Sequence, residues 1–136
     1  MFTLTIDSSF SEVRKASELL YNYCTEYEIP IDLQGQLELM LVEALNNVVE
    51  HAYLEKPGHA INIVLTLEDG STVISITDTG IPAPGSAIAE GSELPDINDM
   101  PEGGWGLCLI QALSDSIEYY RHTDHNQLIL KKQTTI

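Results

Sequence analysis

Residues 60–82 decide the fold of this chain, and they read AINIVLTLEDGSTVISITDTGIP. Apolar and polar side chains alternate over 60–67 and again over 72–77, as they do in half-buried strands. Asp69-Gly70 stands between the two runs, and this dipeptide is typical of the type I′ turn that joins antiparallel strands. The stretch therefore predicts a β-hairpin.

The segments around this hairpin have helical and strand periodicity. The longer helix carries an apolar stripe of Leu37, Leu41, Ala44, Val48 and Ala52. Ser9 and Glu12 have the spacing of a capping box that opens the preceding helix. In chain order we expect a strand at 2–6, helices at 9–28 and 32–53, the hairpin, a helix at 105–113, and strands at 116–121 and 127–132. This order predicts an α+β two-layer sandwich, with one mixed, mostly antiparallel sheet and the helices on one face, in a single domain over residues 1–136.

Composition and charge exclude several classes of protein. The 136 residues include 21 acidic residues against 6 Lys and Arg, which gives a formal net charge of −15. The basic residues are scattered, so we expect no nucleic-acid partner. No apolar run is long enough to span a membrane, so we expect a soluble, cytoplasmic protein. Cys24 and Cys108 lie far apart and lack the spacing of metal ligands.

Residues 81–102 break every periodicity. The segment contains four of the six prolines and five acidic residues. Loops of this length inside a compact domain are uncommon and are often lids or binding segments.

The helix expected at 32–53 carries a polar strip that contains Glu43 and Asn47. At about 100° per residue, these two side chains lie roughly 40° apart on one helix face. A carboxylate one turn from an amide oxygen suits a general base beside Mg²⁺. The alternative is the solvated face of an amphipathic helix.

Asp78-Thr79-Gly80 follows the second strand of the hairpin. The Asp78 carboxylate could accept a hydrogen bond from an exocyclic amine such as N6 of adenine, and Gly80 would let a flat ring approach the backbone. The alternative is an ordinary strand-to-loop turn, in which Asp and Gly are common.

The third candidate is Gly103-Gly104-Trp105-Gly106-Leu107. Glycines that lead into a helix expose backbone amides at its positive end, where phosphate binds well. The spacing matches neither the P-loop nor the dinucleotide fingerprint. The alternative is a flexible hinge before a buried helix.

The three motifs in this order resemble the GHKL ATP-binding superfamily, whose shared architecture is the Bergerat fold. They are Glu43-x-x-x-Asn47, then Asp78-x-Gly80-x-Pro82, and, after a long lid, Gly104-x-Gly106-Leu107. Asn47-x-x-x-His51-x-Tyr53 and Pro82 are similar to the anti-sigma factor serine-protein kinases of bacteria.

The resemblance implies a role for each motif. Glu43 would be the general base, and Asn47 would hold the Mg²⁺ that bridges the ATP phosphates. Asp78 would bind adenine N6, with Gly80 beneath the ring. Gly104, Gly106 and Leu107 would donate backbone amides to the phosphates, and 81–102 would be the ATP lid.

The resemblance also implies an activity and partners. The protein would phosphorylate a serine or threonine of an anti-anti-sigma partner, bind a sigma factor or similar regulator, and form a homodimer. Kinases of this branch often carry an arginine in the lid, whereas residues 98–102 read NDMPE. Two alternatives follow: a nucleotide-binding partner-switching module without appreciable kinase activity, or an interaction protein whose ATP site has decayed.

Overall fold

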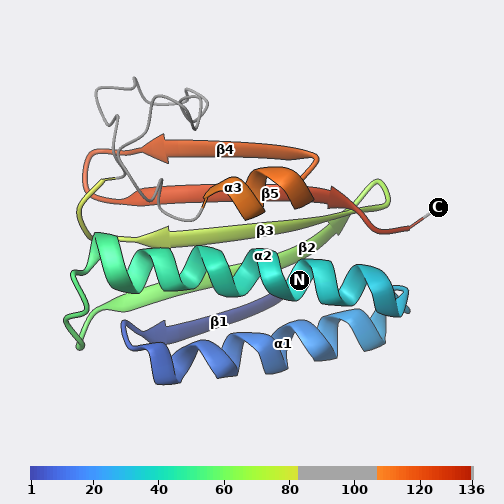
Figure 1. Cartoon of the computed structure of the whole chain (residues 1–136), viewed down its shortest axis with the longest axis horizontal. Coiled ribbons are helices and arrows are strands. Elements are labelled where there is room, and N and C mark those ends of the chain that lie inside the picture. The colour runs from blue at the N-terminus through green and yellow to red at the C-terminus, as the bar shows by residue number, and fades with distance from the viewer. Residues whose placement is uncertain (83–106, 136) are drawn as a thin grey trace.

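The computed structural model describes residues 1–82 and 107–135, and it consists of a helical layer on one five-stranded sheet (Figure 1). The helical segments all lie on the same face of the sheet. The elements are β1 (Phe2–Asp7), the 3₁₀ turn η1 (Phe10–Glu12), α1 (Val13–Glu26), α2 (Ile31–Asn47), the π-helical η2 (Val48–Ala52), β2 (Ala60–Glu68), β3 (Ser71–Asp78), α3 (Leu107–Leu113), β4 (Ser116–Arg121) and β5 (Asn126–Gln133).

The strand order in the sheet is β1-β2-β3-β5-β4. All four pairings of the described strands are antiparallel. The predicted α+β two-layer sandwich is therefore confirmed. The sheet was expected to be mixed, but the described strands contain no parallel pair. After α3 the chain first forms the edge strand β4, and β5 then runs back between β4 and β3, antiparallel to both.

The hairpin of β2 and β3 forms as the sequence predicts. Glu68 pairs with Ser71, so the turn consists of Asp69 and Gly70 alone. Their φ angles are 50° and 82°, and both signs agree with a type I′ turn. The amides of Thr134 and Thr135 donate to the Gly70 carbonyl at 3.0 and 2.9 Å, which fastens the end of the chain to this turn.

The core lies between the sheet and the apolar stripe of α2. Leu37 and Leu41 have no exposed surface, and Ala44, Val48 and Ala52 are also buried. Burial of a Leu or Ile side chain contributes about 1.5–3 kcal/mol, so this stripe fixes α2 on the sheet. The sheet residues that it covers include Ile61, Ile63, Leu65, Ile74, Ile76 and Leu130.

The predicted cap at the start of the first helix is wrong. Ser9 forms no side-chain cap, and the Glu12 carboxylate accepts instead from the Asp7 amide at 3.4 Å. The capping box fails because residues 10–12 form a 3₁₀ turn, which places Glu12 itself at the N-cap of α1. The first helix ends at Glu26, before Glu28 takes a φ of 52°.

The predicted lid, residues 81–102, falls almost wholly outside the described residues, which resume at Leu107. Within the described part of the chain, no helix is long and apolar enough to cross a membrane.

Candidate functional site

The candidate site lies at one end of the sheet. Figure 1 shows the C-terminal end of α2, the end of β3 and the turn between β4 and β5 at the same end of the molecule. Glu43 and Asn47 lie on the last turns of α2, and Asp78 is the last residue of β3. The fold thus brings together two of the three predicted motifs.

Asn47 is a buried amide near the end of α2. Its side chain is 9% exposed, and Nδ2 has no hydrogen-bond partner among the described residues. Glu43, one turn earlier, is partly buried. Buried polar groups are nearly always hydrogen-bonded in native proteins, so an amide left open marks a place where a ligand could bind.

The helix changes its hydrogen-bonding pattern directly after Asn47. The Tyr53 amide donates to the Val48 carbonyl at 3.0 Å, which is the five-residue spacing of a π-helix. Short π segments are frequent at functional sites. Leu54 and Glu55 then take positive φ angles of 53° and 60° and end the helix. The predicted helix over 32–53 is therefore an α-helix only to Asn47.

Asp78 is a buried carboxylate, and the hydrogen bonds that it accepts from described residues fall on one oxygen. Its side chain is 6% exposed. Oδ1 accepts from the Gly80 amide at 2.9 Å and from Asn126 Nδ2 at 2.8 Å. Burial raises the pKa of Asp78, and these two donors, with the charges of Arg121 and His125, partly oppose that rise.

Gly80 is required by packing at this turn. A Cβ on Gly80 would overlap the carbonyl oxygen of Ala52 and would lie 2.7 Å from its carbonyl carbon. The next amide, of Ile81, donates to the same Ala52 oxygen at 2.8 Å. The end of η2 and the turn after β3 are therefore in direct backbone contact.

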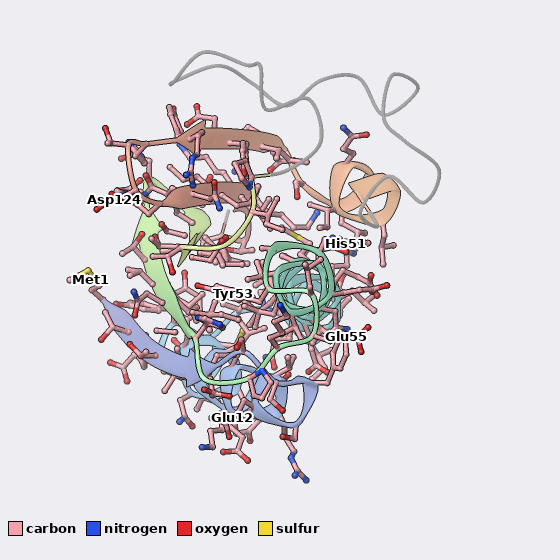
Figure 2. The ribbon with its side chains drawn as sticks, turned by 90° about the vertical axis from the view of Figure 1, so that its left-hand side faces the viewer. Met1, Glu12, His51, Tyr53, Glu55 and Asp124 are labelled. Carbon is pink, nitrogen blue, oxygen red and sulfur yellow. The ribbon has the colours of Figure 1, made fainter. Side chains whose placement is uncertain are left out.

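Tyr53 links η2 to both strands of the hairpin. Its hydroxyl donates to the Ala60 carbonyl at 2.7 Å and accepts from the Thr79 amide at 2.8 Å. Its ring stacks on His59 with centroids 4.8 Å apart. Figure 2, which views this end of the molecule, shows Tyr53 between the helix and the sheet. A groove of about 400 Å³ adjoins these residues and is lined by Ala52, Tyr53, Leu54, Lys56, His59, Thr79, Gly80 and Ile81.

Asn126 belongs to this end of the molecule, and sequence reasoning missed it. It is the first residue of β5, it is 1% exposed, and it pairs with Asp78 across the strands. Besides Asp78 it donates to the Gly80 carbonyl at 3.1 Å, and Arg121 donates to its Oδ1 at 3.0 Å. In the sequence, Asn126 is indistinguishable from an ordinary turn residue. It is far from Asp78 along the chain, so no local pattern indicates that the two side chains meet.

The third predicted motif is described only in part. Leu107 is the first residue of α3, whereas Gly104 and Gly106 lie outside the described residues. Within residues 1–82 and 107–135, no group of three His, Cys, Asp or Glu side chains could hold a metal ion by itself.

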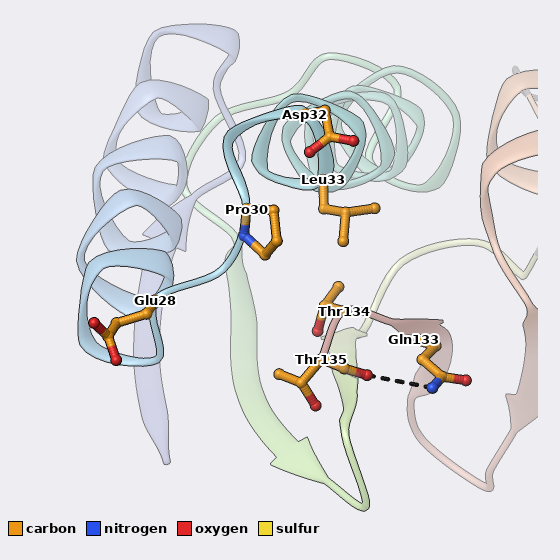
Figure 3. A pocket seen from close by; sticks show the side chains of 7 residues that line it. All are labelled: Glu28, Pro30, Asp32, Leu33, Gln133, Thr134 and Thr135. Atoms are coloured by element: carbon orange, nitrogen blue, oxygen red, sulfur yellow. Dashed lines mark hydrogen bonds between the residues drawn. The ribbon is translucent and has the colours of Figure 1, made fainter.

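A second cavity, of about 550 Å³, lies at the opposite end of the sheet (Figure 3). Residues of the α1–α2 connection face the C-terminal residues of the chain across it. None of the predicted site residues lines this cavity. The lining residues are Glu28, Pro30, Asp32, Leu33, Gln133, Thr134 and Thr135.

Comparison with known proteins agrees with this arrangement. Residues 6–132 match the family of histidine kinase-like ATPase domains. The chain is 35% identical over 91 residues to a serine-protein kinase RsbW of Bacillus mycoides, a match over 64% of this chain and 56% of that protein. It is 33% identical over 100 residues to the serine/threonine-protein kinase BtrW of Bordetella bronchiseptica, over 72% and 69%. The matched region thus spans little more than half of the Bacillus relative.

An anti-sigma F factor of Oceanobacillus iheyensis is 26% identical over 115 residues, which cover 82% of this chain and 73% of that protein. Two solved structures share the fold. One is the SiaB–SiaC complex of Pseudomonas aeruginosa, with a TM-score of 0.69 and 15% identity over 97% of this chain and 89% of that one. The other holds the RsbU and RsbW domains of a Mycobacterium tuberculosis protein, with a TM-score of 0.66 and 17% identity over 98% and 33%.

The match over residues 6–132 runs from the end of β1 into β5 and includes every described residue of the candidate site, so the chain belongs to the family of histidine kinase-like ATPase domains.

Proposed function

We propose that this protein is an anti-sigma regulatory factor that binds Mg-ATP and transfers the γ-phosphoryl group to a serine or threonine of an anti-anti-sigma antagonist. The observation that carries the proposal is the pair of buried polar side chains at one end of the sheet, in a chain of an ATPase family. Asn47 Nδ2 has no partner among the described residues, and both described hydrogen bonds to Asp78 go to Oδ1. Relatives named serine-protein kinase and anti-sigma factor support the activity and the antagonist.

Asp78 would bind the adenine base. Its carboxylate is held by the Gly80 amide and by Asn126, which leaves Oδ2 for the 6-amino group. Gly80, whose backbone is fixed against Ala52, would lie beneath the ring. A carboxylate accepts hydrogen bonds and cannot donate them when ionised, so this end of the site selects an amino group.

Glu43 and Asn47 would act at the phosphates. A positioned carboxylate can take the proton from an attacking hydroxyl, and Glu43 is partly exposed and so within reach of a partner protein. Asn47 would hold Mg²⁺ through Oδ1, since Mg²⁺ is commonly bound by one or two protein oxygens together with substrate phosphates. The open atom, Nδ2, is a hydrogen-bond donor, which suits a phosphate oxygen and not the metal. Mg²⁺ would neutralise phosphate charge, and Gly104, Gly106 and Leu107 would donate backbone amides.

The finer parts of the proposal concern assembly. We infer that residues 1–136 form a single ATP-binding domain with its lid at 81–102, which acts in the cytoplasm as a homodimer. Its regulated partner would be a sigma factor or a similar regulator. The formal net charge of −15 would favour a basic surface on such a partner.

A second function is favoured by the charge of the expected lid. No Lys or Arg occurs between Pro57 and Tyr120, and residues 81–102 contain five acidic residues. Arg121, the next basic residue, already donates to Asn126. Phosphoryl transfer benefits strongly from cationic groups near the phosphates. The alternative is therefore a module that binds nucleotide and switches partners without appreciable kinase activity.

The test begins with nucleotide-dependent melting of the purified protein. Ligand at about 100 times its Kd adds about 2.7 kcal/mol to the folded state, which raises the Tm by roughly 5–15 °C. We expect Mg-ATP and Mg-ADP to give such a shift, Mg-GTP a much smaller one, and Asp78→Asn to lose most of it. Absence of a shift with millimolar ATP would contradict nucleotide binding.

The second stage separates the two functions. The protein is incubated with radiolabelled ATP and a candidate antagonist taken from its own genome. Transfer of label to the antagonist supports the kinase. Nucleotide-dependent binding of the antagonist without transfer supports the partner-switching module.

A further inference from the structure

We propose that Asn126 is a specificity-determining positioning residue. It holds the carboxylate of Asp78 in the one orientation that presents Oδ2 to the 6-amino group of a purine. This inference rests on the proposed function, in which Asp78 binds adenine. It adds a residue that none of the sequence motifs contains.

The orientation of the Asn126 amide is fixed by three partners. The Arg121 guanidinium donates to it at 3.0 Å, and a guanidinium has no acceptor, so the atom that faces Arg121 is Oδ1. Nδ2 is thereby directed to two acceptors, Asp78 Oδ1 at 2.8 Å and the Gly80 carbonyl at 3.1 Å. Asn126 is 1% exposed, so water does not compete for these bonds.

The three residues form a row across the sheet. Arg121 pairs with Asn126 between β4 and β5, and Asn126 pairs with Asp78 between β5 and β3. Directly opposed cross-strand residues have their Cβ atoms about 4.5–5.5 Å apart, so the row is set by strand register and not by flexible loops.

Asn126 restrains the Asp78 carboxylate by donating to one of its two oxygens, Oδ1. Among the described residues, both donors to the Asp78 carboxylate, Asn126 Nδ2 and the Gly80 amide, meet Oδ1. Rotation of the carboxylate out of this plane would break both bonds, so Oδ1 is committed to the protein and Oδ2 is the oxygen that we assign to the ligand. The bond from Nδ2 to the Gly80 carbonyl also fixes the turn on which the base would lie.

This arrangement favours an amino group over an oxo group at position 6 of the purine. The 6-amino group of adenine can donate to Oδ2, whereas the 6-oxo group of hypoxanthine would place two acceptors against each other. Discrimination of this kind depends on a fixed carboxylate, because a carboxylate that can rotate would relieve the repulsion.

The experiment compares ATP with inosine triphosphate (ITP), which carries an oxo group in place of the 6-amino group. Kd values are measured by calorimetry for the wild type and for Asn126→Leu, which removes all three hydrogen bonds at similar volume. Loss of a restraining hydrogen bond to a charged group corresponds to about tenfold in affinity. We expect ATP binding to weaken about tenfold and ITP binding to change less than twofold, so that the preference for ATP falls about tenfold.

The chain offers a matched control in Gln127→Leu. Gln127 is the next residue of β5, and its amide donates to Ser75 at 3.2 Å and not to Asp78. This variant removes an amide from the same strand and should leave both Kd values unchanged. In an Asp78→Asn background the preference is already lost, and Asn126→Leu should lower it no further.

Each result supports or overturns the inference. If Asn126→Leu does not fold, Asn126→Ala removes the same bonds without added bulk and takes its place. An unchanged ratio of the two Kd values overturns the inference, as does an equal loss for ATP and ITP, which would mean general loosening. If the wild type binds ITP but discriminates against it by less than threefold, the inference also fails. If the wild type binds no nucleotide at all, the proposed function fails and the inference falls with it.

Discussion

The core face of β3 and β5 carries a buried polar cluster at each end, and the two clusters differ in charge and in completeness. At one end, Thr72 Oγ1 lies 2.9 Å from the Tyr23 hydroxyl and 2.6 Å from Thr134 Oγ1. At the other end, Asp78 meets Asn126. Between them β3 places Ile74 and Ile76 in the core.

The hydroxyl cluster is neutral and closes on itself. Tyr23 also donates to the Thr66 carbonyl at 3.3 Å, and Thr72 has no exposed surface. The cluster at Asp78 instead contains a buried carboxylate, and Asn47 of the same end has an amide nitrogen without a partner in the described part of the chain. A buried polar cluster whose atoms are all hydrogen-bonded to one another contributes to stability. A cluster with an unsatisfied buried atom has a hydrogen-bonding group that a ligand could use.

The largest expected effect lies at the end of the sheet that holds Asp78 and Asn47, and it concerns activity alone. Glu43→Gln keeps the size of the side chain and removes the base. We expect phosphoryl transfer to fall about 10²–10⁴-fold, the usual contribution of a general base, with ATP-induced melting shifts retained. The measurement is transfer of labelled phosphate to the antagonist.

The control is Glu38→Gln on an exposed turn of α2, which should transfer phosphate normally. If Glu43→Gln were as active as the wild type, Glu43 would not be the base.

The next effect lies in the hydroxyl cluster at the other end of the sheet, and it concerns stability alone. Thr72→Val preserves shape but removes the hydroxyl that Tyr23 and Thr134 share. Tyr23 keeps the Thr66 carbonyl as an acceptor, so the loss falls mainly on Thr134. Unsatisfied buried hydroxyls cost about 1–3 kcal/mol, and we expect that loss in the free energy of unfolding measured by urea denaturation. Nucleotide affinity should not change.

Thr77→Val is the matched control, because Thr77 lies on the same strand but is only partly buried. Its stability should stay within about 0.5 kcal/mol of the wild type. A Thr72→Val protein as stable as this control would show that the hydroxyl cluster contributes nothing.

A third effect, of opposite sign, is expected at Asp78. Burial raises the pKa of Asp78 above its ordinary value, so the folded protein binds this proton more tightly than the unfolded chain. The wild type therefore loses stability as the pH rises through that pKa. Asp78→Asn keeps an acceptor for Asn126 and the Gly80 amide, and without nucleotide it should be more stable than the wild type at pH 7.

This gain should shrink as the pH falls and Asp78 becomes protonated in the folded wild type. Melting temperatures of both proteins from pH 4 to pH 8 measure it. A gain that is constant over this range would show that the charge of Asp78 is not its cause.

The sequence predicted the parts of this molecule that depend on neighbours in the chain. Asp69-Gly70 specifies its turn locally, and the stripe from Leu37 to Ala52 specifies which side of α2 is buried. Glu43, Asn47 and Asp78 were found because their motifs occur in a recognisable order, and their roles remain predictions.

The parts that were missed depend on contacts distant in the chain. Asn126 lies 48 residues from Asp78, and nothing near it in the sequence distinguishes it from an ordinary turn residue. The change to a π-helix after Asn47 brings Ala52 against Gly80 and Ile81, a tertiary contact that no local periodicity reports. Ser9 and Glu12 have the spacing of a capping box, but the box does not form, because the chain enters α1 through a 3₁₀ turn.

The smallest effect is the sharpest test of the difference between the two clusters. Asn47→Leu removes a buried amide, as Thr72→Val removes a buried hydroxyl, but here an unsatisfied nitrogen disappears with it. Leu is also the better helix former, by a few tenths of a kcal/mol. Asn46→Leu corrects for that term, because Asn46 is the preceding residue of α2 and is only partly buried. Without nucleotide, we expect Asn47→Leu to be as stable as Asn46→Leu or up to about 1 kcal/mol more stable, as measured by urea denaturation, and to lose the Mg²⁺-dependent part of ATP binding. A loss of 1 kcal/mol or more relative to Asn46→Leu would mean that Asn47 is satisfied within the protein, and that both clusters are structural.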